Sequence, residues 1–192
     1  MNRRRFLAAA PLAAGSAAAT AQTAAPAAQP CVPPRTPDVV YEPTPLAVVN
    51  TLIEAAGVKQ GDVVYDLGCG DGRFLVAAAQ RGAVGVGFDL NQNLVEWAAA
   101  NALAERVNER VSFEARDLFT ADLSAASVVT LYLLPALNLK LRPKLSKELA
   151  VGSRVVSNAF DMGDWAPDRT FDVPTRYRRA FLWTIKPEHK RA

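Results

Sequence analysis

A chain of 192 residues, half of them apolar and about a fifth charged, has room for one globular domain of ordinary size and a tail. Its formal net charge of +3 comes from residues 1–21, which hold three arginines and no acid, so 19 basic residues balance 19 acidic residues in the remainder. This balance argues against a basic surface for a nucleic-acid partner.

The first 21 residues have the layout of an export signal. Arg3-Arg4-Arg5-Phe6-Leu7 precedes an alanine-rich run that ends in Ala19-Thr20-Ala21, a small-residue cleavage site. The arginines resemble the twin-arginine consensus, and the apolar run is too short for a stable membrane span. We therefore expect residues 1–21 to be a twin-arginine-type signal for the periplasm and residues 22–40, rich in Ala and Pro, to be a linker. A tail without function, and hence a cytoplasmic or membrane-tethered protein, is the alternative.

From Tyr41 onward, β-branched runs alternate with helical segments, which is typical of a parallel sheet flanked by helices. The expected strands are Asp62–Leu67, Val84–Phe88, Val111–Ala115, Ser127–Leu133 and Arg154–Ser157, with a late strand or hairpin arm in Tyr177–Ile185. The expected helices are Leu46–Ala56, Arg73–Arg81, a helix capped by Asn91, and Leu137–Leu149, which Pro143 should split in two. The pattern predicts an α/β domain over residues 41–192 with a mostly parallel central sheet, and leaves the strand order open.

The segment from Asp66 to Gly72 joins a predicted strand to a predicted helix and reads Asp-Leu-Gly-Cys-Gly-Asp-Gly. Its glycines permit a tight turn and the close approach of a ligand. A dinucleotide loop has the spacing Gly-x-Gly-x-x-Gly, whereas here the third glycine comes one residue early. Asp66 and Asp71 would also repel a phosphate. The loop therefore disfavours an NAD-type oxidoreductase and favours a ligand with a cationic amino end and no phosphate, such as S-adenosylmethionine.

Two further acids follow successive strands. Asp89 is placed to accept hydrogen bonds from both hydroxyls of a ribose, and Asp117 to meet the amino group of an adenine. Aspartate is also common at strand ends as a cap or turn residue, so each acid has a structural alternative. Their succession after the glycine loop favours a nucleoside site.

Asp66-x-Gly68-x-Gly70-x-Gly72, Asp89 and Asp117 resemble the successive cofactor-binding motifs of class I methyltransferases. Four segments are more narrowly similar to a family of lysine methyltransferases that includes mitochondrial enzymes acting on the adenine nucleotide translocase and on the ATP synthase c-subunit. These segments are Tyr41–Pro45, Val63–Arg73, Val128–Pro135 and Ser157–Trp165, in which Asn158 stands where a histidine is expected. The resemblance implies a Rossmann-like class I methyltransferase fold with helices on both faces, S-adenosyl-L-methionine as cofactor and a protein lysine as acceptor.

The resemblance also assigns roles to individual residues. Tyr41 and Thr44 should close over the amino-acid end of the cofactor, and Tyr132–Pro135 should border the methyl group. The implied cofactor-binding set is Tyr41, Thr44, Asp66, Gly68, Gly70, Gly72, Asp89, Asn91, Asp117 and Leu118. Apart from the resemblance, an apolar, aromatic-lined pocket would lower the pKa of an acceptor lysine, and Tyr132 and Trp165 are candidates for its wall. Trp165 has an equal alternative as a cover for the sheet edge.

Methyl transfer requires alignment and desolvation more than acid–base chemistry. That suits a chain whose single histidine, His189, is expected to be solvated, and whose two cysteines, Cys31 and Cys69, make no metal cluster or disulfide framework. Export conflicts with a cofactor that is made in the cytoplasm. The chain could act before export, stay tethered, or be an exported, non-catalytic nucleoside or S-adenosylmethionine binder on the same scaffold. The oligomeric state is not predicted.

Overall fold

The structure, a computed structural model, describes residues 39–191. The predicted export signal, residues 1–21, lies outside the described residues, as do residues 22–38 of the predicted linker and Cys31. None of the described helices is long and apolar enough to cross a membrane.

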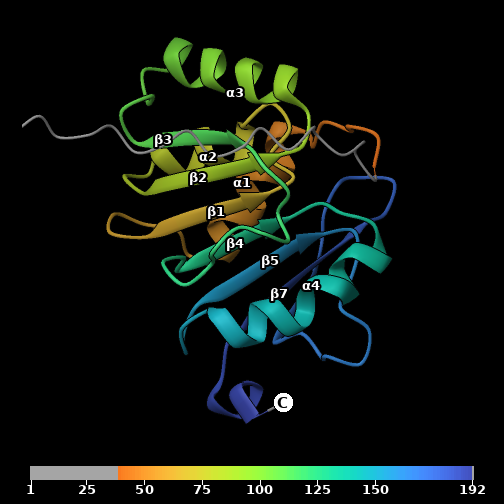
Figure 1. The fold of residues 1–192 in the computed structure, drawn as a ribbon. Coiled ribbons are helices and arrows are strands. Elements are labelled where there is room, and N and C mark those ends of the chain that lie inside the picture. The colour runs from red at the N-terminus through yellow and green to blue at the C-terminus, as the bar shows by residue number, and fades with distance from the viewer. Residues whose placement is uncertain (1–38, 192) are drawn as a thin grey trace, which may run out of the picture. The chain divides into compact units, whose positions relative to one another are not determined.

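The described residues form an α/β domain in which one sheet lies between two layers of helices (Figure 1). The strands are β1 (Val63–Leu67), β2 (Val84–Asp89), β3 (Val111–Ala115), β4 (Val128–Leu131), β5 (Arg154–Asn158), β6 (Arg169–Asp172) and β7 (Arg179–Thr184). The helices are α1 (Leu46–Ala55), α2 (Arg73–Ala79), α3 (Gln92–Ala104) and α4 (Pro135–Glu148), followed by the 3-10 turn η1 (Pro187–Arg191). The predicted α/β fold with a mostly parallel sheet is confirmed.

The strand order is β3-β2-β1-β4-β5-β7-β6, with β1 to β5 parallel and β7 antiparallel to both β5 and β6. The chain winds outward from β1 to β3 and then returns to place β4 on the other side of β1. The winding direction therefore reverses between β1 and β4. In open α/β sheets a crevice forms at the carboxyl ends of the strands at such a reversal, and this is where ligands bind.

The apolar core lies on both faces of the sheet because side chains alternate along each strand. Val64, Val128 and Val156 are buried against α1 and α2. Their neighbours Val129 and Val155 belong to a second buried cluster, on the face that α4 covers. Burial on both faces explains why the central strands read as continuous apolar runs instead of alternating ones.

The prediction that Pro143 splits its helix is wrong, since α4 continues through this residue. Proline removes one helix hydrogen bond, which leaves the carbonyl of Leu139 without its amide partner. Pro143 and Leu139 are both exposed, so water can solvate that carbonyl. Leu141 and Leu145 are fully buried on the opposite side and hold the helix against the sheet.

One edge of the sheet has a strand that was not predicted. The hairpin arm predicted in Tyr177–Ile185 is confirmed as β7, but its partner β6 was not predicted. The β6 sequence Arg-Thr-Phe-Asp is short, polar and mostly exposed, as is common for edge strands.

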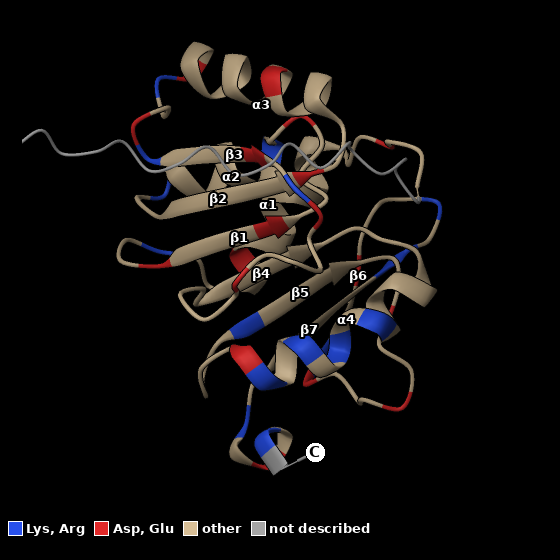
Figure 2. Ribbon diagram, in the orientation of Figure 1, with Lys and Arg blue, Asp and Glu red and all other residues tan. Residues whose placement is uncertain are grey.

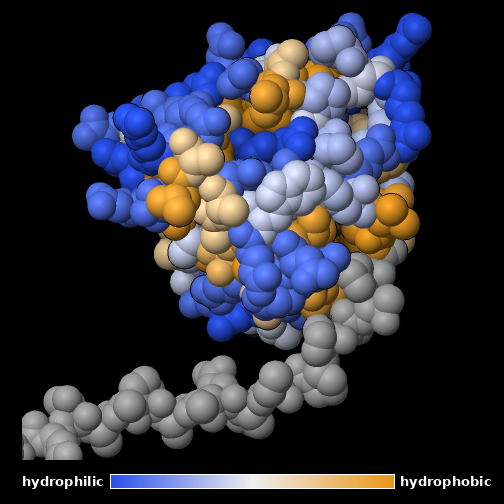
Figure 3. Space-filling view, turned by 90° about the horizontal axis from the view of Figure 1, so that it is seen from above, coloured by the Kyte–Doolittle hydropathy of each residue, from blue (hydrophilic) through white to orange (hydrophobic). Residues whose placement is uncertain are grey.

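Near the opposite edge of the sheet, Asn91 caps α3 as predicted, because its side chain accepts a hydrogen bond from the amide of Asn93 at 3.0 Å. The face seen from the α3 side is largely hydrophilic, with apolar patches separated by polar residues (Figure 3).

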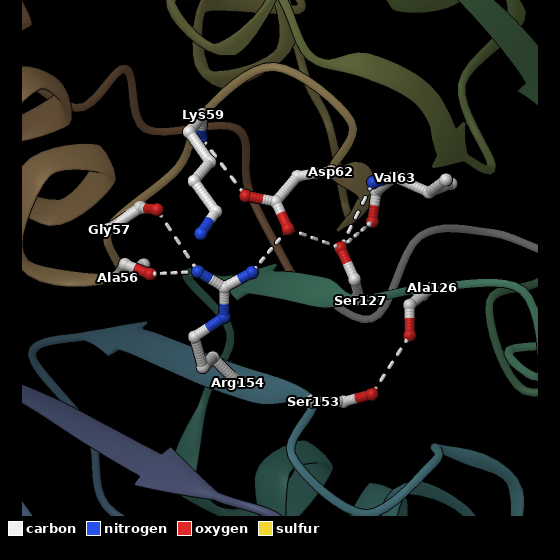
Figure 4. A network of polar contacts seen from close by, with 9 residues as sticks. All are labelled: Ala56, Gly57, Lys59, Asp62, Val63, Ala126, Ser127, Ser153 and Arg154. Atoms are coloured by element: carbon white, nitrogen blue, oxygen red, sulfur yellow. Dashed lines mark hydrogen bonds and ion pairs between the residues drawn. The ribbon is translucent and has the colours of Figure 1, made fainter.

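A polar network ties the amino ends of the central strands to the end of α1 (Figure 4). Arg154, at the start of β5, forms an ion pair with Asp62 and donates hydrogen bonds to the carbonyls of Ala56 and Gly57. Asp62 also accepts hydrogen bonds from the Ser127 hydroxyl at 2.8 Å and from the backbone amide of Lys59 at 3.0 Å. The network therefore joins three strands and one helix at the edge opposite the predicted ligand crevice.

Replacing Asp62 with alanine is expected to lower the free energy of unfolding at pH 7 by about 3 kcal/mol, because the largely buried Arg154 guanidinium loses its counter-ion. Burial raises the pKa of Asp62, but hydrogen bonds from Ser127 and Lys59 and the Arg154 charge outweigh it and hold the pKa below its usual 3.8. The stabilisation is therefore complete above the unfolded-state pKa of 3.8 and is lost as the pH falls through the lower folded value. Urea unfolding should show wild type and variant converging in acid, with the exposed Glu109→Ala as control.

Candidate active site

A cavity of about 170 Å³ lies at the carboxyl ends of β1, β2 and β4, on the side where the winding direction reverses. Acidic residues gather at the ends of these central strands, as the red arrowheads of β1 and β2 show (Figure 2). Most of the predicted site residues line the cavity, namely Tyr41, Thr44, Asp66, Gly68, Gly70, Asp89, Asn91, Leu118 and Tyr132. Gly72, Asp117 and Trp165 are outside its lining. The structure thus brings together residues from five separate stretches of the chain.

The glycine loop adopts backbone conformations that side chains rarely take. The φ angles of Gly68, Gly70 and Gly72 are +87°, +53° and +79°. A Cβ atom on Gly70 would lie 2.4 Å from the ring of Tyr41, so the glycine allows that ring to cover the loop. A Cβ on Gly72 would lie 2.8 Å from the ring of Phe113 in β3. Gly70 therefore serves the cavity, whereas Gly72 serves the packing of the loop against the sheet.

Asp66 is a buried carboxylate at the end of β1, with only 3% of its surface exposed. Its Oδ1 atom accepts a hydrogen bond from the Thr130 hydroxyl at 2.6 Å, while Oδ2 has no hydrogen-bond partner among the described residues. Burial, together with the nearby charges of Asp89 and Asp71, raises the pKa of Asp66 to about 7 against the lowering effect of the Thr130 hydrogen bond. A buried, unpaired carboxylate oxygen beside a cavity is a strong attractor for a cationic donor.

Asp89 ends β2 and is oriented by two backbone amides. Its Oδ2 atom accepts from Gly70 N at 3.0 Å and its Oδ1 atom accepts from Asn91 N at 2.9 Å. Each carboxylate oxygen has a further lone pair, so the group can accept additional bonds from a ligand. The glycine loop and the start of α3 thus present a fixed, bidentate acceptor to the cavity.

Asp117 has a structural role in a turn. Its Oδ1 atom accepts a hydrogen bond from the amide of Phe119 at 2.9 Å, as expected for a turn aspartate. Its neighbours Arg116 and Leu118 line the cavity. The contact of Asp117 with an adenine therefore stays a prediction.

Arg73, the first residue of α2, fastens the segment before α1 onto the glycine loop. It donates hydrogen bonds to Asp71 at 2.5 and 2.7 Å, to the Thr44 carbonyl at 2.5 Å and to the Tyr41 hydroxyl at 3.3 Å. Burial raises the pKa of Asp71, but the hydrogen bonds and charge of Arg73 outweigh it and hold that pKa below its usual range. Because Asp71 is paired, it repels a phosphate less than the sequence suggests. Arg73 is a positioning residue that the sequence analysis did not identify.

A family model of the ANTKMT methyltransferase domain matches residues 66–169, more than half of the chain. The chain is also 44% identical over 158 residues to a protein-lysine N-methyltransferase of Saccharolobus islandicus (strain REY15A), and the match covers 80% of this chain and 98% of that protein. The chain belongs to the ANTKMT methyltransferase family. The predicted family resemblance is thereby confirmed.

Two further comparisons support this assignment. A human lysine N-methyltransferase that is named for the ATP synthase c-subunit is 32% identical over 128 residues, which are 67% of this methyltransferase but only 54% of the human protein. A solved structure of a Salinibacter ruber RNA methyltransferase in complex with S-adenosyl-L-homocysteine is 50% identical, with a TM-score of 0.74, and covers 76% of this chain and 95% of that one. The chain is an S-adenosylmethionine-dependent methyltransferase. An NAD-type oxidoreductase and a non-catalytic binder are therefore not favoured.

The described residues fit this cofactor. Its amino group is a cation, which the unpartnered Oδ2 atom of Asp66 can accept, and its ribose carries two hydroxyls that match the oriented carboxylate of Asp89. S-adenosylmethionine supplies a methyl group that is bonded to a sulfonium sulfur. When a nucleophile takes the methyl group, the sulfur leaves as a neutral thioether. The protein's own task is to hold both reactants in line and to exclude water.

Trp165 does not line the cavity, which contradicts its predicted place in an acceptor pocket. It is 8% exposed and packs in the core against Trp183, with ring centroids 6.1 Å apart, and against His189 at 4.8 Å. His189, expected to be solvated, is half-buried, and its Nδ1 atom accepts from the amide of Lys186. Asp161 is exposed and caps a turn by accepting from the amide of Gly163. Trp165 is an anchor for the C-terminal turn.

Replacing Trp165 with alanine is expected to lower the free energy of unfolding by about 3–5 kcal/mol, as for other buried tryptophans. Because the side chain is outside the cavity, the variant should keep wild-type affinity for S-adenosylhomocysteine at temperatures where it is folded. Thermal unfolding and calorimetric titration measure the two quantities, with the exposed Leu103→Ala as control. Weakened binding by a fully folded variant would return Trp165 to the site.

A group of residues on the Tyr132 side of the cavity was not predicted from the sequence. Glu42, Phe160 and Tyr177 line it beside Tyr132. The rings of Phe160 and Tyr177 pack with centroids 5.0 Å apart. Glu42 and Phe160 fall within segments that resemble the lysine methyltransferases, which was a usable signal. Tyr177 follows β6 and reaches the cavity only because the β6–β7 hairpin lies beside β5.

Proposed function

We propose that this methyltransferase transfers a methyl group from S-adenosylmethionine to the side-chain amine of a lysine in a protein substrate. The observation that carries the proposal is the acceptor side of the cavity, where three aromatic rings from Tyr132, Phe160 and Tyr177 accompany one carboxylate, Glu42. Aromatic faces and a carboxylate suit a cationic head on an apolar stem, which describes lysine. The names of the Saccharolobus and human relatives, both lysine N-methyltransferases, support the same acceptor.

Cofactor binding is assigned within the same proposal. Asp66 holds the amino group, Asp89 holds the ribose hydroxyls, and Tyr41 and Thr44 cover the amino-acid end. Gly68, Gly70, Asn91 and Leu118 complete the lining, and Asp117 meets the adenine amino group from the turn it stabilises. The support is the geometry of the lining and the two carboxylates, Asp66 and Asp89, that can still accept hydrogen bonds.

The reaction requires a lysine that has lost its proton to water, because an ammonium has no lone pair. The lone pair of the amine nitrogen then forms the new N–C bond to the methyl carbon. The C–S bond breaks at the same time, and the electron pair of that bond stays on sulfur. Burial and the negative charge of Glu42 raise the pKa of Tyr132 to about 12, so its phenol stays neutral at physiological pH. Burial beside the three rings lowers the pKa of the bound lysine by desolvation, whereas the negative charge of Glu42 raises it and favours the arriving cation.

An RNA acceptor is the second candidate, since the Salinibacter protein with 50% identity is described as an RNA methyltransferase. The charge of this chain argues against it. Beyond residue 21 the basic and acidic residues balance, whereas RNA-binding surfaces carry a basic excess.

The test incubates the full chain with methyl-labelled S-adenosylmethionine and an extract of the source cells. Label is then counted in protein, RNA, lipid and small molecules, with Asp89→Ala as the inactive control. We expect ribonuclease-resistant label in a discrete protein band. Label that ribonuclease removes, and that protease does not, would replace the lysine proposal with the RNA candidate.

We also propose that the chain is exported through the twin-arginine route, on the support of Arg3-Arg4-Arg5-Phe6-Leu7 in the sequence. That route carries folded proteins, so the cofactor could travel inside the enzyme. In a bacterium that has the pathway, the tagged chain should appear in the periplasmic fraction, and the double variant Arg3→Lys, Arg4→Lys should stay in the cytoplasm. An equal distribution of both proteins would contradict export.

A further inference from the structure

A salt bridge lies at the edge of the cavity, on the side of Tyr132. Arg176, in the loop between β6 and β7, forms an ion pair with Glu42 at 2.5 Å across a sequence separation of 134 residues. Glu42 belongs to the segment before α1, so the pair joins two parts of the chain that flank the cavity. Glu42 lines the cavity, and Arg176 is absent from its lining.

The surroundings of the Arg176 guanidinium are those of a bound cationic ligand. Its central carbon lies 4.7 Å from the ring centroid of Tyr177, a cation–π distance. Burial raises the pKa of the neighbouring Tyr132, and the negative charge of Glu42 raises it further. The ring of Phe160 packs against that of Tyr177, with centroids 5.0 Å apart. The protein thus holds a cation of its own against the aromatic group and the carboxylate that suit a lysine.

The pair is weak enough to be displaced. The side chains of Arg176 and Glu42 are 65% and 47% exposed. Exposed ion pairs stabilise a protein only slightly, because water screens the attraction and two long side chains must be ordered. A cation from another molecule can therefore take the place of Arg176 at little cost.

We propose that Glu42, with Tyr132, Phe160 and Tyr177, forms the subsite that receives the cationic side chain of the acceptor, and that Arg176 occupies this subsite until the acceptor displaces it. Arg176 is then an internal competitor that excludes weakly bound cations and water. Glu42 is a specificity-determining residue that draws the lysine toward the cavity. This inference rests on the proposed lysine acceptor.

The test measures binding to the full chain saturated with S-adenosylhomocysteine. The probe is a fluorescent pentapeptide with a central lysine among glycine and alanine residues, and its side-chain-acetylated form is the uncharged control. Wild type should prefer the lysine peptide. Arg176→Ala should bind that peptide about two- to five-fold more tightly, the factor that corresponds to an exposed ion pair. Arg169→Ala, a nearby arginine stacked on Phe171, is the matched control and should bind as wild type does.

The Glu42→Gln variant separates competition from other effects. It should lose the preference for lysine over acetyl-lysine, and adding Arg176→Ala to it should change binding much less than the same change does in the wild type, because the ion pair with Glu42 is already lost. Weaker binding by Arg176→Ala, or a preference for lysine that survives in Glu42→Gln, would overturn the subsite. If lysine still receives label while the subsite predictions fail, the proposed function stands alone. If the subsite predictions hold while no protein is labelled, the site is confirmed as a cation subsite and the lysine transfer fails.

Discussion

Replacing Asp89 with alanine is expected to weaken the binding of S-adenosylhomocysteine about 100-fold, which corresponds to about 3 kcal/mol. The carboxylate accepts hydrogen bonds from the amides of Gly70 and Asn91 and faces the cavity with its remaining lone pairs. Alanine removes the acceptor for the ribose and also leaves two backbone amides without their partner. Calorimetric titration with S-adenosylhomocysteine measures the effect without requiring an acceptor.

Two controls separate the ligand contact from loop disorder. Asp89→Asn keeps the size of the side chain but replaces one accepting oxygen with a donor, so it should bind about as poorly as the alanine variant while its unfolding temperature stays closer to wild type. The exposed Glu109→Ala should bind normally. Wild-type affinity in both Asp89 variants would contradict the assignment of this residue to the cofactor.

Affinity for the cofactor is expected to depend on pH through Asp66. Burial, with smaller contributions from Asp89 and Asp71, raises the pKa of Asp66 to about 7. Below that pH the carboxyl is protonated and no longer attracts the cationic amino group. Affinity for S-adenosylhomocysteine should therefore fall about tenfold for each unit below pH 7, the slope of one linked proton. Titrations between pH 5.5 and 7.5 measure this slope, because an α-amino group stays protonated over that range.

The Asp66→Asn variant should show weak and nearly pH-independent binding, since the amide does not titrate. It should also change stability without ligand. The folded state of the wild type keeps a proton that the unfolded state releases between pH 3.8 and about 7, so its free energy of unfolding falls as the pH rises through that interval. The asparagine side chain does not titrate, so the variant lacks this fall in the free energy of unfolding and should be more stable than the wild type at pH 8. A wild-type slope in the variant would remove Asp66 from the linkage.

The clustering of the glycine loop, Asp66 and Asp89 around one cavity could be predicted from the sequence because its determinants are local. The glycine loop, Asp66 and Asp89 lie directly at the ends of β1 and β2, and parallel strands bring such ends to one edge. Asn91 was recognisable as a cap for the same reason. In each case the residue type and its place after an apolar run carried the information.

The Tyr132 side of the cavity could not be predicted in the same way. Tyr177 reaches the cavity, and Arg176 reaches Glu42, only after the β6–β7 hairpin adds to the sheet, and β6 has too few apolar residues to be recognised as a strand. Trp165 looked like a site residue by its position after β5, yet the loop turns it into the core beside Trp183. Both outcomes depend on long-range packing, which neighbouring residues in the sequence do not encode.

The most direct test of the central claim is the identity of the methylated atom. Protein labelled by the full chain with S-adenosylmethionine would be digested, and the modified peptide sequenced by mass spectrometry. If the acceptor is lysine, methyl groups should be found on the side-chain nitrogen of lysine with the wild-type enzyme and should be absent with Asp89→Ala. Methyl groups that appear only on another residue type, or only on RNA, would contradict it.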